Sequence, residues 1–348
     1  MYQLNEKIRD LVPYDPIDGE YSIRLDANES CLQPPAEMQK RLLEAASRVA
    51  WNRYPDASCR ELCESFGAFY GVDPSLVTPG DGSDELISIL CNAFLMPGET
   101  LVTAEPDFSM YRFYASVSGA RTASFQKGED LTVDPEAFIE FINREKARMV
   151  IFSNPCNPTG RGLSREDVRK ILRSTEALVV LDEAYMDFWD QSLLSEVCEY
   201  DNLLILRTCS KALGMASLRL GFAVGNPTLT RALWAVKSPY NINSFTQAMG
   251  AAVLREKEWA QRALSSILES RENLYSSLKK LEERNPGKFS CCSTCTNFVF
   301  LKVPEGRRIF EALLQRGIAI RYMGEYLRVT AGTPEENKQF LQAFQDVL

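Results

Sequence analysis

The sequence contains no histidine in its 348 residues. This absence excludes nucleophilic sites of the Ser-His-Asp and Cys-His types, zinc held by imidazole groups, and acid–base catalysis by histidine. A proton-transfer enzyme with this composition must therefore use lysine, tyrosine, aspartate, glutamate or cysteine.

Long apolar runs and dense basic clusters are also missing. No stretch reaches the roughly 18 consecutive apolar residues that a membrane helix needs, and residues 1–10 carry charges of both signs without the apolar core of a secretory signal. The formal net charge is −8, from 39 basic and 47 acidic residues. An acidic chain without a Lys/Arg-rich patch argues against a nucleic-acid partner. These features predict a soluble cytoplasmic protein with neither a membrane nor a nucleic acid among its partners.

The ten cysteines do not show the spacing of a metal site. Most lie in apolar contexts, as Cys91 does in the segment ILCNAF, which is typical of buried thiols in a reducing compartment. Cys291, Cys292 and Cys295 lie close together, but a metal site would need a further Cys or His pair at suitable spacing. We therefore expect buried or half-exposed thiols and no bound metal.

From about residue 75, short apolar runs alternate with segments of helical periodicity. The apolar runs predict buried strands at 100–104, 148–153, 177–185 and 203–208. The segments between them predict helices at 83–96, 134–143 and 165–174. This alternation indicates an α/β domain with a mostly parallel sheet that is covered on both faces.

After Pro239 the pattern changes. The segment 244–283 is nearly free of Gly and Pro and predicts one or two long helices. Strands are then expected at 289–292, 297–303, 318–322 and 326–330, with helices at 306–316 and 335–347. The sequence thus predicts a large domain over residues 31–238, a smaller α+β domain over 239–348, and an N-terminal arm over 1–30 that packs with the small domain.

Lys211 stands in the most distinctive segment, RTCSKALGMASLRLG, at positions 207–221. Most lysines are solvated surface residues, but this one follows a buried strand and is flanked by hydroxyl groups and, eight residues later, an arginine. Ligands bind at the strand ends of parallel α/β sheets. A desolvated lysine in such a place can form an imine, so Lys211 is a candidate for covalent chemistry.

Nine further segments accompany this one in order along nearly the whole chain. They are LDANE (25–29), NRYPD (52–56), GDGSDE (80–85), EPDFSMY (105–111), NPCNPTG (154–160), LDEAYMDF (181–188), PYNIN (239–243), TNFVFL (296–301) and LRVTAGTPEEN (327–337). Together the ten segments resemble the class I/II aminotransferases of the fold type I (aspartate aminotransferase) superfamily and, within it, the histidinol-phosphate aminotransferases. The resemblance implies a large domain that binds pyridoxal 5′-phosphate (PLP), with a seven-stranded sheet between helices, and a smaller α+β domain.

The resemblance assigns roles around the cofactor ring. Lys211 would form the Schiff base with PLP and shuttle protons, and Asp182 would pair with the protonated pyridine nitrogen. Tyr185 and Asn157 would hydrogen-bond the ring hydroxyl, and Phe108 would stack on the ring. Asn157 before a proline is also typical of a turn, and Phe108 could equally be a core residue.

A phosphate site is expected where a loop enters a helix at residues 82–84, since free backbone N–H groups and the helix dipole attract anions there. Ser83 would also serve as an ordinary N-cap. The resemblance implies that the cofactor phosphate contacts Gly82, Ser83, Asp84, Thr208, Ser210 and Arg219. Tyr54 would reach the same phosphate from a partner subunit, which implies a homodimer.

Arg328 lies in the apolar segment LRVT, where an arginine is rarely found without an anionic partner. In the family that it resembles, this arginine binds the anionic end of the substrate through a bidentate contact. Arg321 matches a second anion-binding arginine, although an exposed strand-end arginine would give the same pattern. Tyr14 and Asn28, in the arm, match positions that close over the substrate.

The resemblance implies a histidinol-phosphate:2-oxoglutarate aminotransferase of histidine biosynthesis, which works by ping-pong transamination through Lys211. Its partners would be a small-molecule amino donor and an oxo-acid acceptor. Two alternatives remain: an aminotransferase for aromatic or varied amino acids, and a lyase like the threonine-phosphate decarboxylases. The chain departs from the usual pattern at Cys156, Cys209 and Ser217, where relatives often carry other small or polar residues.

Overall fold

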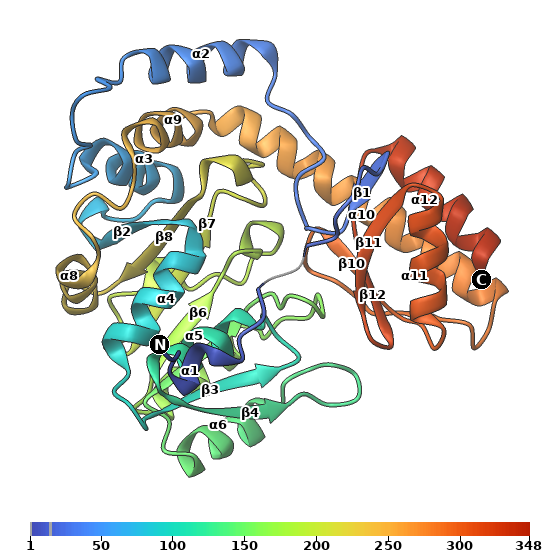
Figure 1. Cartoon of the computed structure of the whole chain (residues 1–348), viewed down its shortest axis with the longest axis horizontal. Coiled ribbons are helices and arrows are strands. Elements are labelled where there is room, and N and C mark those ends of the chain that lie inside the picture. The colour runs from blue at the N-terminus through green and yellow to red at the C-terminus, as the bar shows by residue number, and fades with distance from the viewer. Residues whose placement is uncertain (1, 14–15) are drawn as a thin grey trace.

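The computed structural model describes residues 2–13 and 16–348, which include two β-sheets (Figure 1). The larger sheet has seven strands in the order β2-β8-β7-β6-β5-β3-β4. Its strands are β2 (Val77–Asp81), β3 (Thr100–Glu105), β4 (Arg121–Gln126), β5 (Met149–Ser153), β6 (Leu178–Asp182), β7 (Leu203–Thr208) and β8 (Leu220–Gly225). Only β8 runs antiparallel to its neighbours, so the mostly parallel seven-stranded sheet predicted from the sequence is confirmed.

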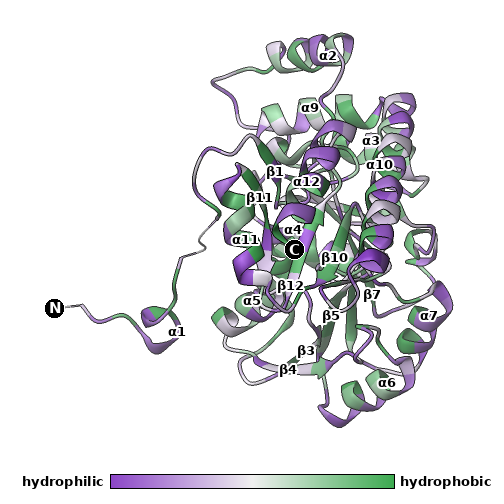
Figure 2. Ribbon diagram, turned by 90° about the vertical axis from the view of Figure 1, so that its right-hand side faces the viewer, coloured by the Kyte–Doolittle hydropathy of each residue, from purple (hydrophilic) through white to green (hydrophobic). Residues whose placement is uncertain are grey.

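Helices cover both faces of this sheet. The elements are α2 (Ala36–Ser47), α3 (Arg60–Tyr70), α4 (Gly82–Phe94), α5 (Met110–Ser118), α6 (Pro135–Arg144), α7 (Arg165–Arg173) and α8 (Pro227–Val236). Successive strand residues point to opposite faces. Val179 and Leu181 therefore pack with α2, α3, α6 and α7, whereas Val180 packs with α4, α5 and α8. Burial on both sides explains why the central strands are continuous apolar runs, and Figure 2 shows them as hydrophobic ribbons inside more hydrophilic helices.

Two of the predicted helices start at side chains that satisfy their free N–H groups. Ser164 and Asp167 form a reciprocal capping box at the start of α7, and Asp134 caps α6 by accepting from the backbone N–H of Ala137. The predicted helices at 134–143 and 165–174 are confirmed within one or two residues. The predicted strand 177–185 is shorter, because the N–H of Ala184 donates to the Asp182 carboxylate and the chain then turns.

The smaller sheet has five strands in the order β1-β11-β12-β10-β9. Its strands are β1 (Ile23–Leu25), β9 (Ser290–Cys291), β10 (Phe298–Lys302), β11 (Ile318–Met323) and β12 (Tyr326–Thr330), and it packs with α11 (Gly306–Gln315) and α12 (Pro334–Val347). Strand β1 comes from the N-terminal arm and pairs in parallel with β11. The arm is therefore part of this sheet, while the short helix α1 (Glu6–Arg9) contacts α5 of the larger unit.

A long helix, α10 (Lys257–Arg284), belongs to both cores. Trp259, Ala260 and Ala263 are in the hydrophobic cluster of the larger sheet, together with residues of α9 (Ser244–Leu254). The cluster of the smaller sheet includes Leu274 and later residues of the same helix. The change from one core to the other thus lies within α10.

The remaining elements are single 3-10 turns: η1 (Pro74–Leu76), η2 (Met186–Phe188), η3 (Leu194–Glu196) and η4 (Ala216–Leu218). In the part of the chain that the structure describes, no helix combines the length and apolarity of a membrane span.

Gly221→Ala should destabilise the protein, because a Cβ at position 221 would lie 2.4 Å from the backbone nitrogen of Ser83, at the start of α4. The helix start and β8 would have to separate, and overpacking of this kind typically costs about 1–3 kcal/mol of unfolding free energy. Urea denaturation would measure the loss. The matched control is Gly225→Ala in the same strand, where the nearest atom lies at 3.2 Å. Equal stability of the two variants would contradict this close approach.

Candidate active site

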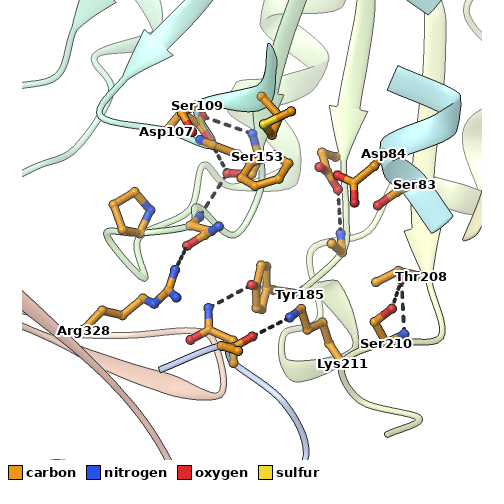
Figure 3. Close-up of a pocket in the computed structure, with 18 of the residues that line it drawn as sticks. Ser83, Asp84, Asp107, Ser109, Ser153, Tyr185, Thr208, Ser210, Lys211 and Arg328 are labelled. Carbon is orange, nitrogen blue, oxygen red and sulfur yellow. Dashed lines mark hydrogen bonds between the residues drawn. The ribbon is translucent and has the colours of Figure 1, made fainter. Parts of the chain in front are cut away.

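A pocket of about 410 Å³ lies where the carboxyl ends of β5, β6 and β7 approach β11 and β12 (Figure 3). Most of the residues predicted from the sequence line it: Asn28, Ser83, Asp84, Phe108, Asn157, Asp182, Tyr185, Thr208, Ser210, Lys211, Arg219, Arg321 and Arg328. They come from both sheets, from the loops after the strands and from the N-terminal arm. The structure thus brings together groups that are up to 300 positions apart in the sequence (Asn28 and Arg328).

Lys211 lies just after β7, and its Nζ donates to the backbone oxygen of Ala27 at 2.9 Å. The same Nζ lies 5.9 Å from the centre of the Tyr185 ring. The Tyr185 hydroxyl accepts a hydrogen bond from Nδ2 of Asn28 at 2.9 Å. Residues of the arm therefore contact both Lys211 and Tyr185, as Figure 3 shows.

Asp182 is the last residue of β6 and is only 4% exposed. Its Oδ2 accepts from the Tyr111 hydroxyl at 2.7 Å, and its Oδ1 accepts from the N–H of Ala184 at 3.0 Å. Burial raises the pKa of Asp182 to about 6. Within residues 2–13 and 16–348, no lysine or arginine forms an ion pair with it. A buried carboxylate is costly unless it is paired, so this end of the pocket suits a cationic group.

Another end of the pocket suits an anion. Helix α4 begins there with residues 82–84, beside the hydroxyl groups of Thr208 and Ser210, which are 3.1 Å apart. The guanidinium of Arg219 lies 3.3 Å from Asp84, and its backbone oxygen accepts from the N–H of Gly82. A helix start, two hydroxyl groups and an arginine together have the chemistry of a phosphate site.

The backbone conformation at position 82 and the closeness of Arg219 both require a glycine there. Its φ is +74°, and a Cβ there would lie 2.6 Å from Nη2 of Arg219. Gly82 does not line the pocket, but it allows Arg219 to lie against the start of α4.

Two arginines lie side by side on neighbouring strands of the smaller sheet. Arg321 of β11 and Arg328 of β12 are direct register partners in an antiparallel pair, and both line the pocket. Arg328 is 9% exposed, and its guanidinium donates to Oδ1 of Asn157 and to the backbone oxygen of Asp26. Two guanidinium groups in the wall of one pocket have the hydrogen-bond donors that bind carboxylates and phosphates.

Two further predicted residues are Tyr54 and Tyr14. Tyr54 is 81% exposed and stacks on Tyr240, with ring centres 4.7 Å apart, outside the residues that line the pocket. Tyr14 lies outside the described residues. Within one chain, therefore, the structure does not bring Tyr54 to the helix start at residue 82.

A buried ion cluster behind the pocket was missed by the sequence analysis. Arg207 lies 2.8 Å from Glu183 and 2.8 Å from Asp187, which in turn accepts from the Tyr70 hydroxyl at 3.1 Å. Arg207 and Glu183 directly neighbour Thr208 and Asp182 in sequence and point to the opposite face of the sheet. The cluster thus anchors the two strand ends that supply pocket residues. Tyr111 was missed as well, since a tyrosine in an amphipathic helix gives no sign of its carboxylate partner.

Solved structures with the same fold identify its class. The histidinol-phosphate aminotransferase from Sinorhizobium meliloti, in complex with pyridoxal-5′-phosphate, covers 100% of this chain and aligns over 98% of its own, with a TM-score of 0.89 and 22% identity. An aspartate aminotransferase from Thermus thermophilus with maleate aligns over 100% of both chains, with a TM-score of 0.84 and 20% identity. The fold is that of the fold type I transferases, as the sequence predicted.

The sequence comparison then identifies the family. A model of the family "Aminotransferase class I and II" matches residues 21–344, and this chain belongs to that family. It is 38% identical to the histidinol-phosphate aminotransferase of Clostridium novyi, over 97% of this chain and 95% of that protein. It is 34% identical to that of Thermoanaerobacter pseudethanolicus, over 99% and 98%. The reaction class is therefore transfer of an amino group between small amino and oxo compounds.

Asp182→Asn should make the ligand-free protein more stable than wild type above pH 6. Burial raises the pKa of Asp182 from 3.8 to about 6. Protonation therefore stabilises the fold at low pH, and this stabilisation is lost as the pH rises through 6. Asparagine removes the desolvated charge, so the gain in unfolding free energy should approach about 3 kcal/mol at alkaline pH.

Urea denaturation at about pH 8 and about pH 4 would check the expected pH dependence of this gain. The gain should nearly vanish at the lower pH. The exposed residue Asp201 offers the control, because Asp201→Asn should change stability little at either pH. A gain for Asp182→Asn that is the same at both pH values would rule out a buried charge as its cause.

Proposed function

We propose that this protein is a PLP-dependent aminotransferase that uses histidinol phosphate and 2-oxoglutarate, in histidine biosynthesis. The observation that carries the proposal is that a lysine, a buried carboxylate and two facing arginines line one pocket. Relatives at 34–38% identity over nearly the full length bear the name of this activity.

The residues present fit PLP at each of its polar groups. The buried carboxylate of Asp182 suits the protonated pyridine nitrogen, and the start of α4 with Arg219 suits the phosphate. Lys211 supplies the amine for the aldehyde carbon. Further cofactor contacts in this proposal come from Gly82, Ser83, Asp84, Phe108, Asn157, Tyr185, Thr208 and Ser210. When bound, the cofactor supplies an electron sink for the substrate carbon that loses its proton.

Lys211 is the residue that we propose to move protons. With cofactor and amino donor bound, its Nζ would be a free amine that takes up and holds the proton removed from the donor Cα. The backbone oxygen of Ala27 accepts from this amine and orients it, and the Tyr185 ring lies 5.9 Å away. The absence of histidine is compatible with this mechanism because one lysine performs both tasks.

The two facing arginines provide the substrate preference in this proposal. Histidinol phosphate carries a phosphate, and 2-oxoglutarate carries carboxylates, so each half-reaction brings an anion to Arg321 and Arg328. Guanidinium groups bind either anion by paired hydrogen bonds. Asn28 and the N-terminal arm, with Tyr14, would close over the bound substrate.

We also propose a cytoplasmic homodimer. Tyr54 and Trp51 are 81% and 86% exposed, and large exposed aromatic side chains are typical of protein contact surfaces. A partner subunit could bring its own Tyr54 to the phosphate site. All ten cysteines are free thiols, which suits a reducing compartment. The division into an arm, a large domain and a small domain remains part of this proposal.

An activity assay separates the candidate functions. Purified protein should convert histidinol phosphate with 2-oxoglutarate at least about tenfold more efficiently than it converts phenylalanine or tyrosine, since only the former places a phosphate between two guanidinium groups. Faster turnover of the aromatic amino acids would replace the proposal with an aromatic aminotransferase. Release of carbon dioxide or ammonia without an oxo acid would replace it with a lyase.

Lys211→Ala should remove the visible absorbance band that the bound cofactor gives in wild-type protein. It should also lower kcat about a thousandfold or more, because both the covalent attachment and the proton carrier are lost. Absorbance spectra and steady-state rates would measure the two effects. Lys280→Ala, at an exposed residue that does not line the pocket, is the control and should keep the wild-type spectrum and rate. An unchanged spectrum in Lys211→Ala would show that this lysine does not bind the cofactor covalently.

A further inference from the structure

A buried lysine that the proposed mechanism does not use lies behind the pocket. Lys127 follows β4, and its side chain is 3% exposed. Its Nζ donates to the backbone oxygen of Pro106 at 2.7 Å and to Sγ of Cys156 at 2.9 Å. It lies 3.9 Å from the carboxylate of Asp107, whose side chain is fully buried. Burying both charges is costly, so the pair calls for an explanation beyond packing.

Asp107 joins two loops that reach the pocket. Its Oδ1 accepts from the backbone N–H of Phe108 at 2.8 Å, and its Oδ2 accepts from that of Ser153 at 3.1 Å. The hydroxyl of Ser153 also donates to this carboxylate and accepts from the N–H of Asn157 at 3.0 Å. Figure 3 shows the Asp107–Ser153 contact at the edge of the pocket. One carboxylate thus fixes the backbone of the two loops that carry Phe108 and Asn157.

The connections continue to the substrate end of the pocket. Oδ1 of Asn157 accepts from the guanidinium of Arg328, which lies in the smaller sheet. A series of contacts therefore runs from Lys127 through Asp107, Ser153 and Asn157 to Arg328. The contacts of Lys127 with Pro106 and Cys156 hold the same two loops from behind.

The charge of Lys127 is needed for this arrangement. Burial raises the pKa of Asp107 to about 6, and the nearby ammonium opposes that shift. Without the ammonium, Asp107 would more readily bind a proton, and a protonated carboxyl competes as a donor with the Ser153 hydroxyl. The hydrogen bonds that hold Phe108 and Asn157 would then be rearranged.

We propose that Lys127 and Asp107 form a positioning pair that holds Phe108 and Asn157 in place around the cofactor ring. Asp107 lines the pocket, whereas Lys127 does not, and the pair acts on the ring site through Phe108 and Asn157. The proposal rests on the proposed function, since it concerns the placement of PLP.

Lys127→Met keeps the length of the side chain and removes its charge. We expect this variant to bind PLP more weakly, with a smaller visible circular dichroism band, because the ring is held less rigidly. Its kcat should fall about tenfold to a hundredfold while KM changes little, as small misplacements of reacting groups have effects of this size. Lys127→Arg should restore the band and most of kcat, because it restores the charge.

Two further variants separate positioning from stability. Cys156→Ser keeps both charges and a hydrogen-bond acceptor for Lys127, so its band and kcat should match wild type. Ser153→Ala breaks the link to Asn157 but leaves the ion pair intact. It should reproduce the loss of band and kcat with a smaller loss of melting temperature than Lys127→Met, and it provides the test if Lys127→Met does not fold.

The outcomes are distinguishable. If Lys127→Met or Ser153→Ala melts at a lower temperature but keeps the wild-type circular dichroism band and kcat, the pair is only structural and this inference is wrong. If wild-type protein binds no PLP, the proposed function fails first and the inference with it. The rates are measured with whichever amino donor the wild type accepts, so an error in the substrate assignment does not affect the comparison.

Discussion

The carboxylate of Asp182, buried at the end of a central strand, constrains the rest of the site. A charge in that position must have partners, and the described protein groups offer only neutral ones, the Tyr111 hydroxyl and the N–H of Ala184. A cationic ligand group would neutralise this carboxylate, and the other polar groups of the pocket suit the rest of such a ligand. The start of α4 and the amine of Lys211 lie in the same pocket, so a ligand with a cationic ring, a reactive carbon and a phosphate would suit all three groups.

The alternation of side chains along β6 and β7 explains how this charge is held in place. Asp182 and Thr208 face the pocket, while their neighbours Glu183 and Arg207 form an ion pair on the opposite face of the sheet. The ion pair of Arg207 and Glu183 thus fixes the two strand ends, while Asp182 and Thr208 on the other face stay available to bind a ligand. A similar division occurs at the edge of the pocket, where Asp107 lines the pocket and its buried partner Lys127 does not.

The sequence predicted the central strands well because they are continuous apolar runs, a consequence of burial on both faces. It did not predict β2, β4 or β8. Strand β2 contains a proline and a glycine, β8 contains two glycines, and β4, at the edge, is only partly buried. Site residues within recognisable segments, such as Lys211 and Arg328, were predicted. The contacts of Tyr111, Lys127 and Arg207 were not, because each depends on a partner distant in the chain, and the role proposed for Tyr54 requires a second subunit.

Helix α10 has a mechanical consequence. It is an unbroken helix of 28 residues, which corresponds to about 42 Å at 1.5 Å per residue. Its first turns are packed in one core and its last turns in the other, so the two sheets are joined by a rigid rod as well as by loops. A rod resists sharp bending, and β1 of the N-terminal arm is paired with β11. Any rocking of one sheet against the other should therefore be small and should carry β1 along with the smaller sheet.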